Sequence, residues 1–478
     1  MTARSSSDEP AGVYQGEPGI GPDLSPPFTA EDDITRWLFS LNRFGIRPGL
    51  ARIDALLDEL DHPERQVTSL VVAGTNGKGS STRILAGLLR AAGYRVACFT
   101  SPHLLRVYER LTIDDQPCDP AHFAAEVHKL RPAVERHGAS WFETLTALAL
   151  DLCRAAEVDY LCCEVGLGGR LDATNALPAE AILLTTVARD HCRILGDSLA
   201  EIADEKLGLL KSGVPLFCGV NEALRSQVFT TAVAAGAPCF FLDELAEWQP
   251  GGDHWTLRTR RREIRDLPDL PAPVLRRNFA LAWLCLEELA AAGSVRLPAD
   301  PAAALAGVFL PGRFQQVLQD PDWIFDTAHN EEALLACLDG FLARPVPGRR
   351  FVLFSSMQHK DLGPAVGDRL RACDEMVAAP VRLPRSRNRD ELTALLGAWQ
   401  LPPAGSPPVQ ADSSAAITYL ARKLTPEDTV LVTGSGFLVA ETLYRLGYND
   451  IEETRGCEAA AHRLAPYGYV NPHPGRQA

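Results

Sequence analysis

The stretch that decides the fold is Gly74-Thr75-Asn76-Gly77-Lys78-Gly79-Ser80. It follows the apolar run Leu70-Val71-Val72-Ala73, and after it apolar residues recur at helical spacing. A strand, a glycine-rich turn and a helix in this order are the setting of a phosphate-binding loop. In such a loop the backbone N–H groups and the helix N-terminus face phosphate oxygens, the lysine reaches the terminal phosphates, and the serine hydroxyl serves Mg²⁺.

This loop departs from the common spacing, because Gly79 separates the lysine from the hydroxyl residue. The alternative interpretation is a glycine-rich turn that binds no ligand. A lysine and a serine placed in this way favour nucleotide binding, so ATP is the expected ligand and Mg²⁺ its companion ion.

Length and composition limit the classes of protein that come into question. The chain of 478 residues predicts two domains, or three, and its 46% hydrophobic content suffices for substantial cores. Its 61 acidic and 47 basic side chains give a net charge of −14, and no long Lys/Arg stripe is present, so we expect no nucleic-acid partner. The densest basic cluster, residues 258–262, is followed at once by Glu263 and is interpreted as a solvated strand or loop face.

Cysteine usage and hydropathy predict a cytoplasmic protein. The 12 cysteines form no C-x-x-C pair, and Cys162 and Cys163 lie in an apolar run, which is typical of buried thiols in a reducing compartment. The N-terminus has no signal-peptide pattern, and no apolar stretch of about 18 residues occurs, so we expect no membrane partner.

Strand and helix patterns alternate along most of the chain and predict an α/β fold with mostly parallel sheets covered on both faces. We expect a disordered tail at residues 1–28, a P-loop ATP-binding domain at 29–310 and a Rossmann-like C-terminal α/β ligase domain at 311–478. Residues 250–275 give only a weak secondary-structure signal. The predicted strands are 70–73, 95–99, 158–165, 181–187, 323–325, 351–354, 375–379 and 429–433, and the predicted helices include 34–38, 51–60, 141–156, 198–210 and 278–292.

Four polar residues lie at or just after the ends of predicted strands or of the phosphate loop: Ser80, Ser101, Glu164 and His191. Ligands of open α/β sheets bind beyond the carboxyl ends of the strands, so these side chains are expected to share one site. Glu164 is a candidate Mg²⁺ ligand or, alternatively, a paired structural carboxylate. His191 is a less usual Mg²⁺ ligand, and its alternative is an ordinary loop histidine.

Three further stretches carry candidate functional groups. Lys206 lies on a helix face that could turn toward the same site or could simply be solvated. The strand end at residues 325–330 offers polar groups for a ribose or phosphate, or is a turn capped by Asn330. Arg313, after Pro311 and Gly312, could steady a nucleotide across a cleft or be an exposed hinge arginine.

Taken together these stretches resemble the folylpolyglutamate synthase/dihydrofolate synthase family of the Mur-type ATP-dependent amide ligases. The most specific motif is Glu164-Val-Gly-Leu-Gly-Gly-Arg-Leu-Asp-Ala-Thr-Asn175. The other matching segments, which run along almost the whole chain, are residues 44–50, 73–80, 101–104, 109–110, 142–143, 190–191, 195–196, 205–206, 311–313, 326–330, 360–361 and 433–435.

The resemblance implies a mechanism. ATP phosphorylates the substrate carboxylate to an acyl phosphate, and the amine of L-glutamate attacks it to give an amide, ADP and phosphate. It also implies a catalytic set of Lys78, Glu164, His191 and Lys206, with Lys206 carbamylated. The implied metal ligands are Ser80, Ser101, Glu164 and His191; the implied nucleotide contacts are Gly74, Thr75, Asn76, Gly77, Lys78, Gly79, Ser80, Asn278, Arg313 and Asp326; and the residues implied near the pterin end are Phe142, Glu143, Leu171, Asp172 and Ala173.

Some positions depart from the usual form of the family. Val71 stands where a histidine is frequent, and Arg47-Pro48 replaces an acidic- or Lys-Leu pair near the pterin pocket. Thr327 and Glu331 replace a glycine and a proline, and residues 275–277 lack the expected glutamine and glycine. These changes spare the residues for ATP and Mg²⁺ and affect substrate recognition and the domain interface.

The sequence therefore predicts a monomeric, ATP- and Mg²⁺-dependent ligase that adds L-glutamate to dihydropteroate, to tetrahydrofolate or to both. Its predicted partners are these small molecules. Two alternatives stay open: a divergent Mur-type ligase that joins an amino acid to another carboxylate, and a non-catalytic nucleotide-binding protein.

Overall fold

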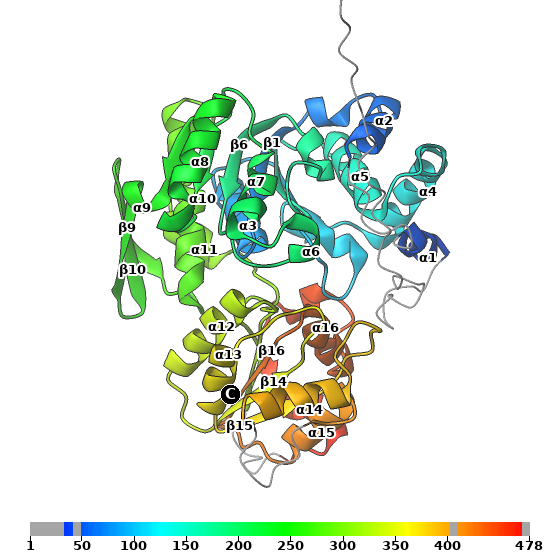
Figure 1. The fold of residues 1–478 in the computed structure, drawn as a ribbon, viewed down its shortest axis with the longest axis vertical. Helices are drawn as coiled ribbons and strands as arrows, with labels where there is room; N and C mark the ends of the chain where they lie inside the picture. The colour runs from blue at the N-terminus through cyan, green and yellow to red at the C-terminus, as the bar shows by residue number, and fades with distance from the viewer. Residues whose placement is uncertain (1–32, 42–48, 402–408, 471–478) are drawn as a thin grey trace, which may run out of the picture.

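The computed structural model describes residues 33–41, 49–401 and 409–470. The predicted tail at residues 1–28 and the Arg47-Pro48 pair lie outside these ranges. Two α/β domains lie one above the other in Figure 1, the N-terminal domain coloured blue to green and the C-terminal domain yellow to red.

The N-terminal domain is built on an eight-stranded sheet in the order β4-β3-β2-β5-β1-β6-β7-β8. Six neighbouring strands, from β2 to β8 in that order, are parallel, and β3 and β4 add an antiparallel edge. The strands are β1 (Thr68–Ala73), β2 (Val96–Phe99), β3 (Leu111–Ile113), β4 (Gln116–Pro117), β5 (Tyr160–Glu164), β6 (Ala179–Leu184), β7 (Leu216–Cys218) and β8 (Cys239–Phe241).

Helices cover both faces of this sheet, because successive side chains of each buried strand point to opposite sides. Leu70 and Val72 pack toward α3 and α10, whereas Val71 and Ala73 pack toward α7 and α8. The helices are α1 (Asp33–Ser40), α2 (Ala51–Glu59), α3 (Lys78–Ala91), α4 (Pro120–His137), α5 (Trp141–Ala155), α6 (Cys192–Leu195), α7 (Leu199–Leu207), α8 (Glu222–Ala235), α9 (Leu242–Leu245), α10 (Pro273–Ala291) and α11 (Pro301–Ala306). Helix α10 begins five residues before the predicted start at 278.

The region of weak secondary-structure signal forms a small antiparallel sheet, β9 (Ala246–Gly251), β10 (His254–Thr259) and β11 (Glu263–Pro268). Trp255 and Leu257 are buried, and the Trp255 ring packs edge-on to Phe279 of α10 with centroids 5.5 Å apart. The four arginines of residues 258–262 are exposed, and three of them pair with acids: Arg258 with Glu263 at 3.1 Å, Arg261 with Glu288 and Arg262 with Glu287. The interpretation of this cluster as a solvated face is confirmed.

The C-terminal domain holds a six-stranded sheet in the order β15-β14-β16-β13-β12-β17, parallel except for the β12–β13 pair. All four strands predicted in this half of the sequence are present. The strands are β12 (Gln315–Gln319), β13 (Asp322–Phe325), β14 (Arg350–Phe354), β15 (Glu375–Ala378), β16 (Thr429–Thr433) and β17 (Glu458–Ala459), and the helices are α12 (Glu331–Ala343), α13 (Pro364–Arg371), α14 (Arg389–Ala398), α15 (Ser413–Ala421), α16 (Gly436–Arg445) and α17 (Ala460–Leu464).

One loop of the N-terminal domain is anchored in the core of the other domain. Leu104 and Leu105, which follow β2, are buried in the same apolar cluster as Val317, Phe325 and Val432. The predicted boundary between residues 310 and 311 falls between α11 and β12 and stays a prediction.

No helix in the described ranges is both long enough and apolar enough to cross a membrane. All 12 cysteines are free thiols, and Cys162 and Cys163 are fully buried, as predicted.

Candidate functional site

The phosphate loop runs from the end of β1 into α3. Two of its glycines have backbone angles that side-chain-bearing residues rarely adopt, φ 141° at Gly74 and 85° at Gly77. A Cβ on Gly74 would lie 1.9 Å from Thr185 Oγ1, and one on Gly77 would lie 2.6 Å from Asn278 Oδ1. Glycine is therefore required both by the turn and by what packs against it.

Two threonines at the end of β6 hold the loop in place. Thr185 Oγ1 donates to the Asn76 carbonyl at 2.7 Å, and Thr186 Oγ1 accepts from the Asn76 N–H at 3.0 Å. The Lys78 ammonium donates to the Thr75 carbonyl at 3.1 Å. The N–H groups of the first turn of α3 have no carbonyl partner within the helix, as in every helix, and they line a cavity.

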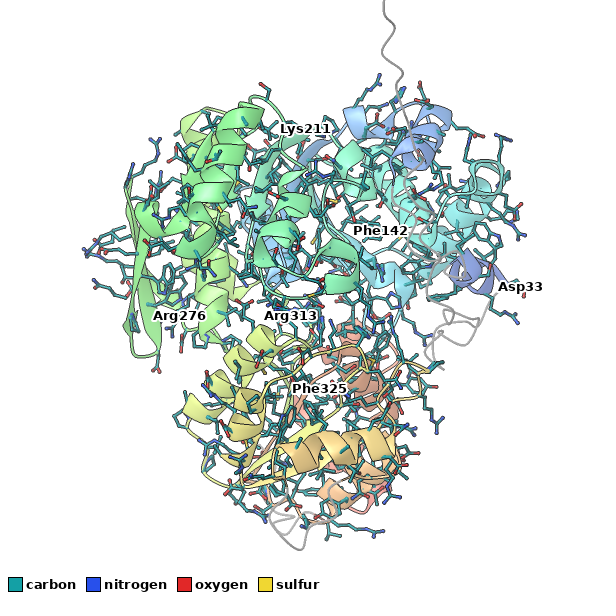
Figure 2. The ribbon with its side chains drawn as sticks, in the orientation of Figure 1. Asp33, Phe142, Lys211, Arg276, Arg313 and Phe325 are labelled. Atoms are coloured by element: carbon teal, nitrogen blue, oxygen red, sulfur yellow. The ribbon has the colours of Figure 1, made fainter. Side chains whose placement is uncertain are left out.

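That cavity has a volume of about 620 Å³ and is lined by both domains. Figure 2 shows Arg313 at their junction, above Phe325 of the C-terminal domain. Every residue predicted for catalysis, nucleotide binding or metal binding lines it: Gly74 to Ser80, Ser101, Glu164, His191, Lys206, Asn278, Arg313 and Asp326. The structure thus brings these predicted residues together.

Glu164 ends β5 and is 3% exposed. Its Oε2 accepts the Ser101 N–H at 2.8 Å and would lie 3.1 Å from a Cβ on Gly79, so the carboxylate touches the phosphate loop. Burial raises the pKa of Glu164, and the charges of Lys78, Arg313 and Arg110 and the Ser101 hydrogen bond act against this rise. Within residues 33–41, 49–401 and 409–470 Glu164 forms no ion pair, so the alternative of a paired structural carboxylate has no partner there.

Lys206 lies near the end of α7 and is 5% exposed, so the interpretation as a solvated face is wrong. Its Nζ donates to the Gly74 carbonyl at 2.9 Å. Burial lowers the pKa of Lys206 to about 7, and the charge of Lys78 acts in the same direction. A large neutral fraction of this amine is therefore present near neutral pH.

His191 has the left-handed backbone angle φ 52° and stands at the N-terminus of α6, where its side chain is 45% exposed. Desolvation lowers the pKa of His191 to about 4, despite the opposing charge of Asp190. The imidazole is thus neutral at pH 7 and has a lone pair to offer. Its backbone N–H donates to Asp190 Oδ1 at 2.8 Å.

The C-terminal domain brings Arg313 and Asp326 to the cavity. Asp326 accepts the N–H groups of Phe314 and Ala328, both at 2.8 Å. Burial raises the pKa of Asp326, against the charge of Arg313. Arg313 also opposes the raised pKa of Glu164. Its charge therefore acts on one buried carboxyl group of each domain, and Arg313 is not a simple exposed hinge residue.

Asn330 caps a helix and also crosses the cleft. Its Oδ1 accepts the Ala333 N–H at 3.0 Å at the start of α12, which confirms the cap that the sequence offered as an alternative. Its Nδ2 donates to Asn76 Oδ1 at 2.8 Å and to Asp190 Oδ2 at 3.1 Å. One side chain thus starts a helix and touches two parts of the N-terminal domain.

None of the five residues predicted near the pterin end lines this cavity. The Phe142 ring packs on Gly166, which does line it, and Glu143 forms an ion pair with Arg52 at 2.9 Å. Asp172 is buried and accepts the Leu167 N–H at 2.8 Å. The two remaining members differ in exposure, since Leu171 is 46% exposed and Ala173 is buried.

The donor set of the cavity fits a nucleotide with a hard cation. Asn278 Nδ2, among the described residues, is a buried donor without a partner, and the first turn of α3 adds unpaired N–H groups. Glu164 supplies one carboxylate beside two serine hydroxyls, which suits Mg²⁺, an ion that keeps waters and phosphate oxygens as further ligands. In the described part of the chain no cluster of three or more His, Cys, Asp or Glu side chains forms a metal site from protein alone.

Comparison with known proteins agrees with this geometry. The family profile described as Mur ligase, glutamate ligase domain matches residues 312–436. The dihydrofolate synthase/folylpolyglutamate synthase of Bacillus subtilis is 30% identical over 440 residues, which cover 88% of this chain and all of that protein. The chain belongs to the dihydrofolate synthase/folylpolyglutamate synthase family.

Solved structures of the family have the same fold. Escherichia coli FolC in complex with DHPP and ADP is 30% identical, with a TM-score of 0.77 over 87% of this chain and 98% of that one. The bifunctional synthase from Yersinia pestis complexed with AMPPNP and Mn ion is also 30% identical, with a TM-score of 0.77 over 88% and 99% of the two chains. The two-domain α/β architecture predicted from the sequence is confirmed.

The prediction of the site left out residues that the structure places beside it. Asp190 and Lys360 form a buried ion pair of 2.5 Å, and Thr185 and Thr186 support the loop. The threonines could have been found from their position after the predicted strand 181–187, next to the loop strand. The ion pair could not, because nothing local in the sequence relates residue 190 to residue 360.

Proposed function

We propose that this chain is an ATP- and Mg²⁺-dependent ligase that adds L-glutamate to dihydropteroate, to tetrahydrofolate or to both. The observation that carries this proposal is the meeting of the phosphate loop, Glu164 and Lys206 in one cavity that both domains line. A non-catalytic nucleotide-binding protein would not require a buried carboxylate and a neutral amine beside the loop.

The chain's own residues divide the work of phosphoryl transfer. The N–H groups of residues 77–80 and the Lys78 ammonium bind the phosphates of ATP, and Arg313 and Asn278 hold the nucleotide from the other sides. Ser80, Ser101, Glu164 and His191 would hold Mg²⁺. When bound, this ion spreads the charge that develops on the transferred phosphoryl group.

The carboxylate oxygen of the acid attacks the γ-phosphorus, ADP leaves, and an acyl phosphate forms. The neutral amine of L-glutamate then attacks the acyl carbon, the phosphate leaves, and the amine proton is lost as the amide forms. Water would hydrolyse the acyl phosphate, so the second domain must exclude water from the cavity until the amine arrives.

Lys206 is proposed to carry a carbamate. A neutral lysine amine adds CO₂ and releases a proton, which leaves an oxygen-bearing anion, the carbamate, beside the loop. What supports this is the burial that lowers the pKa of Lys206 to about 7. Phe142, Glu143, Leu171, Asp172 and Ala173 are proposed to lie near the pterin end of the acid, next to the 166–168 wall of the cavity. We further propose that the enzyme is a cytoplasmic monomer and that its partners are small molecules.

The experiment that tests the function is phosphate release by purified protein with Mg·ATP and L-glutamate, in the presence of dihydropteroate, tetrahydrofolate or neither, with product masses. A gain of one glutamyl unit on dihydropteroate means dihydrofolate synthesis, and a gain on tetrahydrofolate means polyglutamylation. Turnover of neither acid would contradict the proposal, and ATP binding without any acid-dependent turnover would favour a binding protein.

A further inference from the structure

Asp190 joins the two domains at the edge of the cavity. Its Oδ1 lies 2.5 Å from the Lys360 ammonium, and its Oδ2 accepts from Asn330 Nδ2 at 3.1 Å and lies 3.5 Å from His329 Nε2. These three partners come from the C-terminal domain, and the side chains of Asp190 and Lys360 are each only 8% exposed. An ion pair with so little access to water forms only when the domains are together.

The same carboxylate fixes a residue of the proposed catalytic set. Oδ1, which accepts from Lys360, also accepts the backbone N–H of His191 at 2.8 Å. His191 has the unusual left-handed backbone angle φ 52°, which needs support from its surroundings. The position of His191 therefore depends on a side chain whose own position depends on the other domain.

Asn330 extends this connection to the phosphate loop. It exchanges two hydrogen bonds with Asn76, at 2.8 Å from its Nδ2 and at 3.3 Å to its Oδ1. Asn330 is itself fixed at the start of α12 by its bond from the Ala333 N–H. A rigid helix end thus touches the loop and Asp190 at the same time.

Separation of the domains would break the contacts of Asp190 with Lys360 and Asn330, and those of Asn330 with Asn76, all together. Removing one partner of a buried ion pair leaves an uncompensated charge, which is strongly unfavourable, whereas both charges are hydrated if the cleft opens. Ligands that fill a cavity between domains must enter when the domains part, so the contacts form after the ligands are in place.

We propose that Asp190, Lys360 and Asn330 form an interdomain latch that sets His191 and Asn76 in their working positions only when the domains are closed. The three are positioning residues for the phosphoryl transfer, and this role rests on the proposed function. The site is therefore complete only when the two domains are closed on each other.

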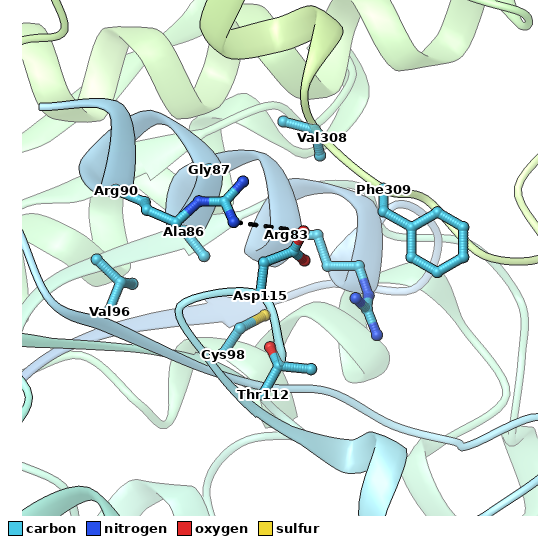
Figure 3. A pocket seen from close by; sticks show the side chains of 10 residues that line it. All are labelled: Arg83, Ala86, Gly87, Arg90, Val96, Cys98, Thr112, Asp115, Val308 and Phe309. Carbon is cyan, nitrogen blue, oxygen red and sulfur yellow. Dashed lines mark ion pairs between the residues drawn. The ribbon is translucent and has the colours of Figure 1, made fainter. Parts of the chain in front are cut away.

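The structure offers a control in a second ion pair between the domains. Arg455 of the C-terminal domain forms an ion pair with Asp115 of the N-terminal domain at 2.9 Å and covers the Phe309 ring at 4.2 Å. Figure 3 shows Asp115 and Phe309 lining a small cavity together with side chains of α3, with Arg90 paired to Asp115. This contact also joins the domains, but it involves no residue of the proposed site.

The experiment compares Lys360→Met, Asp190→Asn, their double variant and Arg455→Met. Asp190→Asn keeps the size of the side chain and an oxygen that can accept the His191 N–H, so it carries the test if Lys360→Met does not fold. We expect each single latch variant to lose about a hundredfold in kcat, with a smaller change in KM for ATP. The double variant should lose no more than one single variant, because the pair acts as a unit. Arg455→Met should stay within about threefold of the original kcat. In a variant that combines it with Lys360→Met, the two factors of kcat loss should multiply, because the two sites are independent.

Small-angle X-ray scattering with saturating Mg·ADP gives a second readout that a purely structural role would not move. The unchanged chain and Arg455→Met should scatter as the closed structure does, whereas Lys360→Met and Asp190→Asn should show a larger radius of gyration. Latch variants that scatter as the closed form, or whose kcat losses multiply in the double variant, would overturn the proposal. The scattering comparison needs no acid or glutamate, so it decides the latch even if the proposed ligase activity fails.

Discussion

At the scale of single residues, burial shifts the pKa values of three titratable groups of the cavity toward the neutral form. It raises the pKa of Glu164, lowers that of Lys206 to about 7 and lowers that of His191 to about 4. Without ligands these groups are therefore poorly solvated as charges. The charges of bound ATP and of its metal ion would therefore stabilise the charged forms of these groups, which the protein alone stabilises poorly.

Glu164→Gln should retain the fold and lose at least about a hundredfold in kcat, because the amide removes a charge at the proposed metal site. The Gln oxygen can still accept the Ser101 N–H, which Glu164 accepts at 2.8 Å. Acid-dependent phosphate release measures the loss, and thermal unfolding checks the fold. Near-normal turnover would contradict the assignment of Glu164 as a metal ligand.

The lowered pKa of Lys206 predicts how activity depends on pH and CO₂. At pH 7.5 an ordinary lysine of pKa 10.5 is neutral in about one molecule in a thousand, whereas a pKa of about 7 makes roughly three quarters neutral. Since only the neutral amine adds CO₂, activity at fixed dissolved CO₂ should rise as pH passes upward through about 7. Enzyme depleted of CO₂ should lose activity and recover it on addition of bicarbonate.

Lys206→Ala should abolish turnover, with partial recovery when short carboxylates are added. Lys211→Ala is the control: this lysine, labelled in Figure 2, also has a lowered pKa, but it donates to the carbonyls of Asn175 and Leu177 and does not line the cavity. It should affect stability and not the response to carboxylates. Full activity of Lys206→Ala without any addition would refute the carbamate.

At the scale of elements, the unit of β1, loop and α3 was predictable because its information is local. An apolar run, three glycines and a helical period follow one another within the 24 residues from Thr68 to Ala91. The sheet of β9 to β11 was missed because only Trp255, Leu257, Ile264 and Leu267 mark its buried face. Runs of charged residues between them, such as those at 260–263, obscure the period of two on which recognition of a strand depends.

Gly74→Ala should destabilise the chain and prevent ATP binding, because the methyl group would meet Thr185 Oγ1 at 1.9 Å. Gly93→Ala is the matched control, since Gly93 also has a positive φ, 86°, but has nothing within 4 Å of a Cβ. We expect a cost of about 1 kcal/mol at Gly93 and more than about 2 kcal/mol at Gly74. Denaturant unfolding and nucleotide titration measure both, and equal effects of the two substitutions would contradict the role given to packing.

At the scale of the whole molecule, the sequence predicted two α/β domains and the residues that line their shared cavity, but not how the domains touch. Asn76 and Asn330 are 254 positions apart, and Asp190 and Lys360 are 170 apart. No periodicity or turn signal relates such pairs, because their contact follows from the orientation of two separately folded sheets. The resemblance named these residues as motifs without revealing that they meet.

The anchoring of Leu104 and Leu105 has a consequence for the exchange of domains between relatives. The side chain of Leu104 also lies against Gly312, where an added Cβ would meet it at 3.0 Å. In a chimera joined between residues 310 and 311, Leu104 and Leu105 of one parent would pack into the C-terminal core of the other parent. We expect that such hybrids fold and turn over only when residues 101–105 come from the same parent as the C-terminal half. The measurement is the soluble yield and turnover of paired hybrids that differ only in which parent supplies residues 101–105. Higher values when these five residues match the C-terminal half would show that they function as part of that domain.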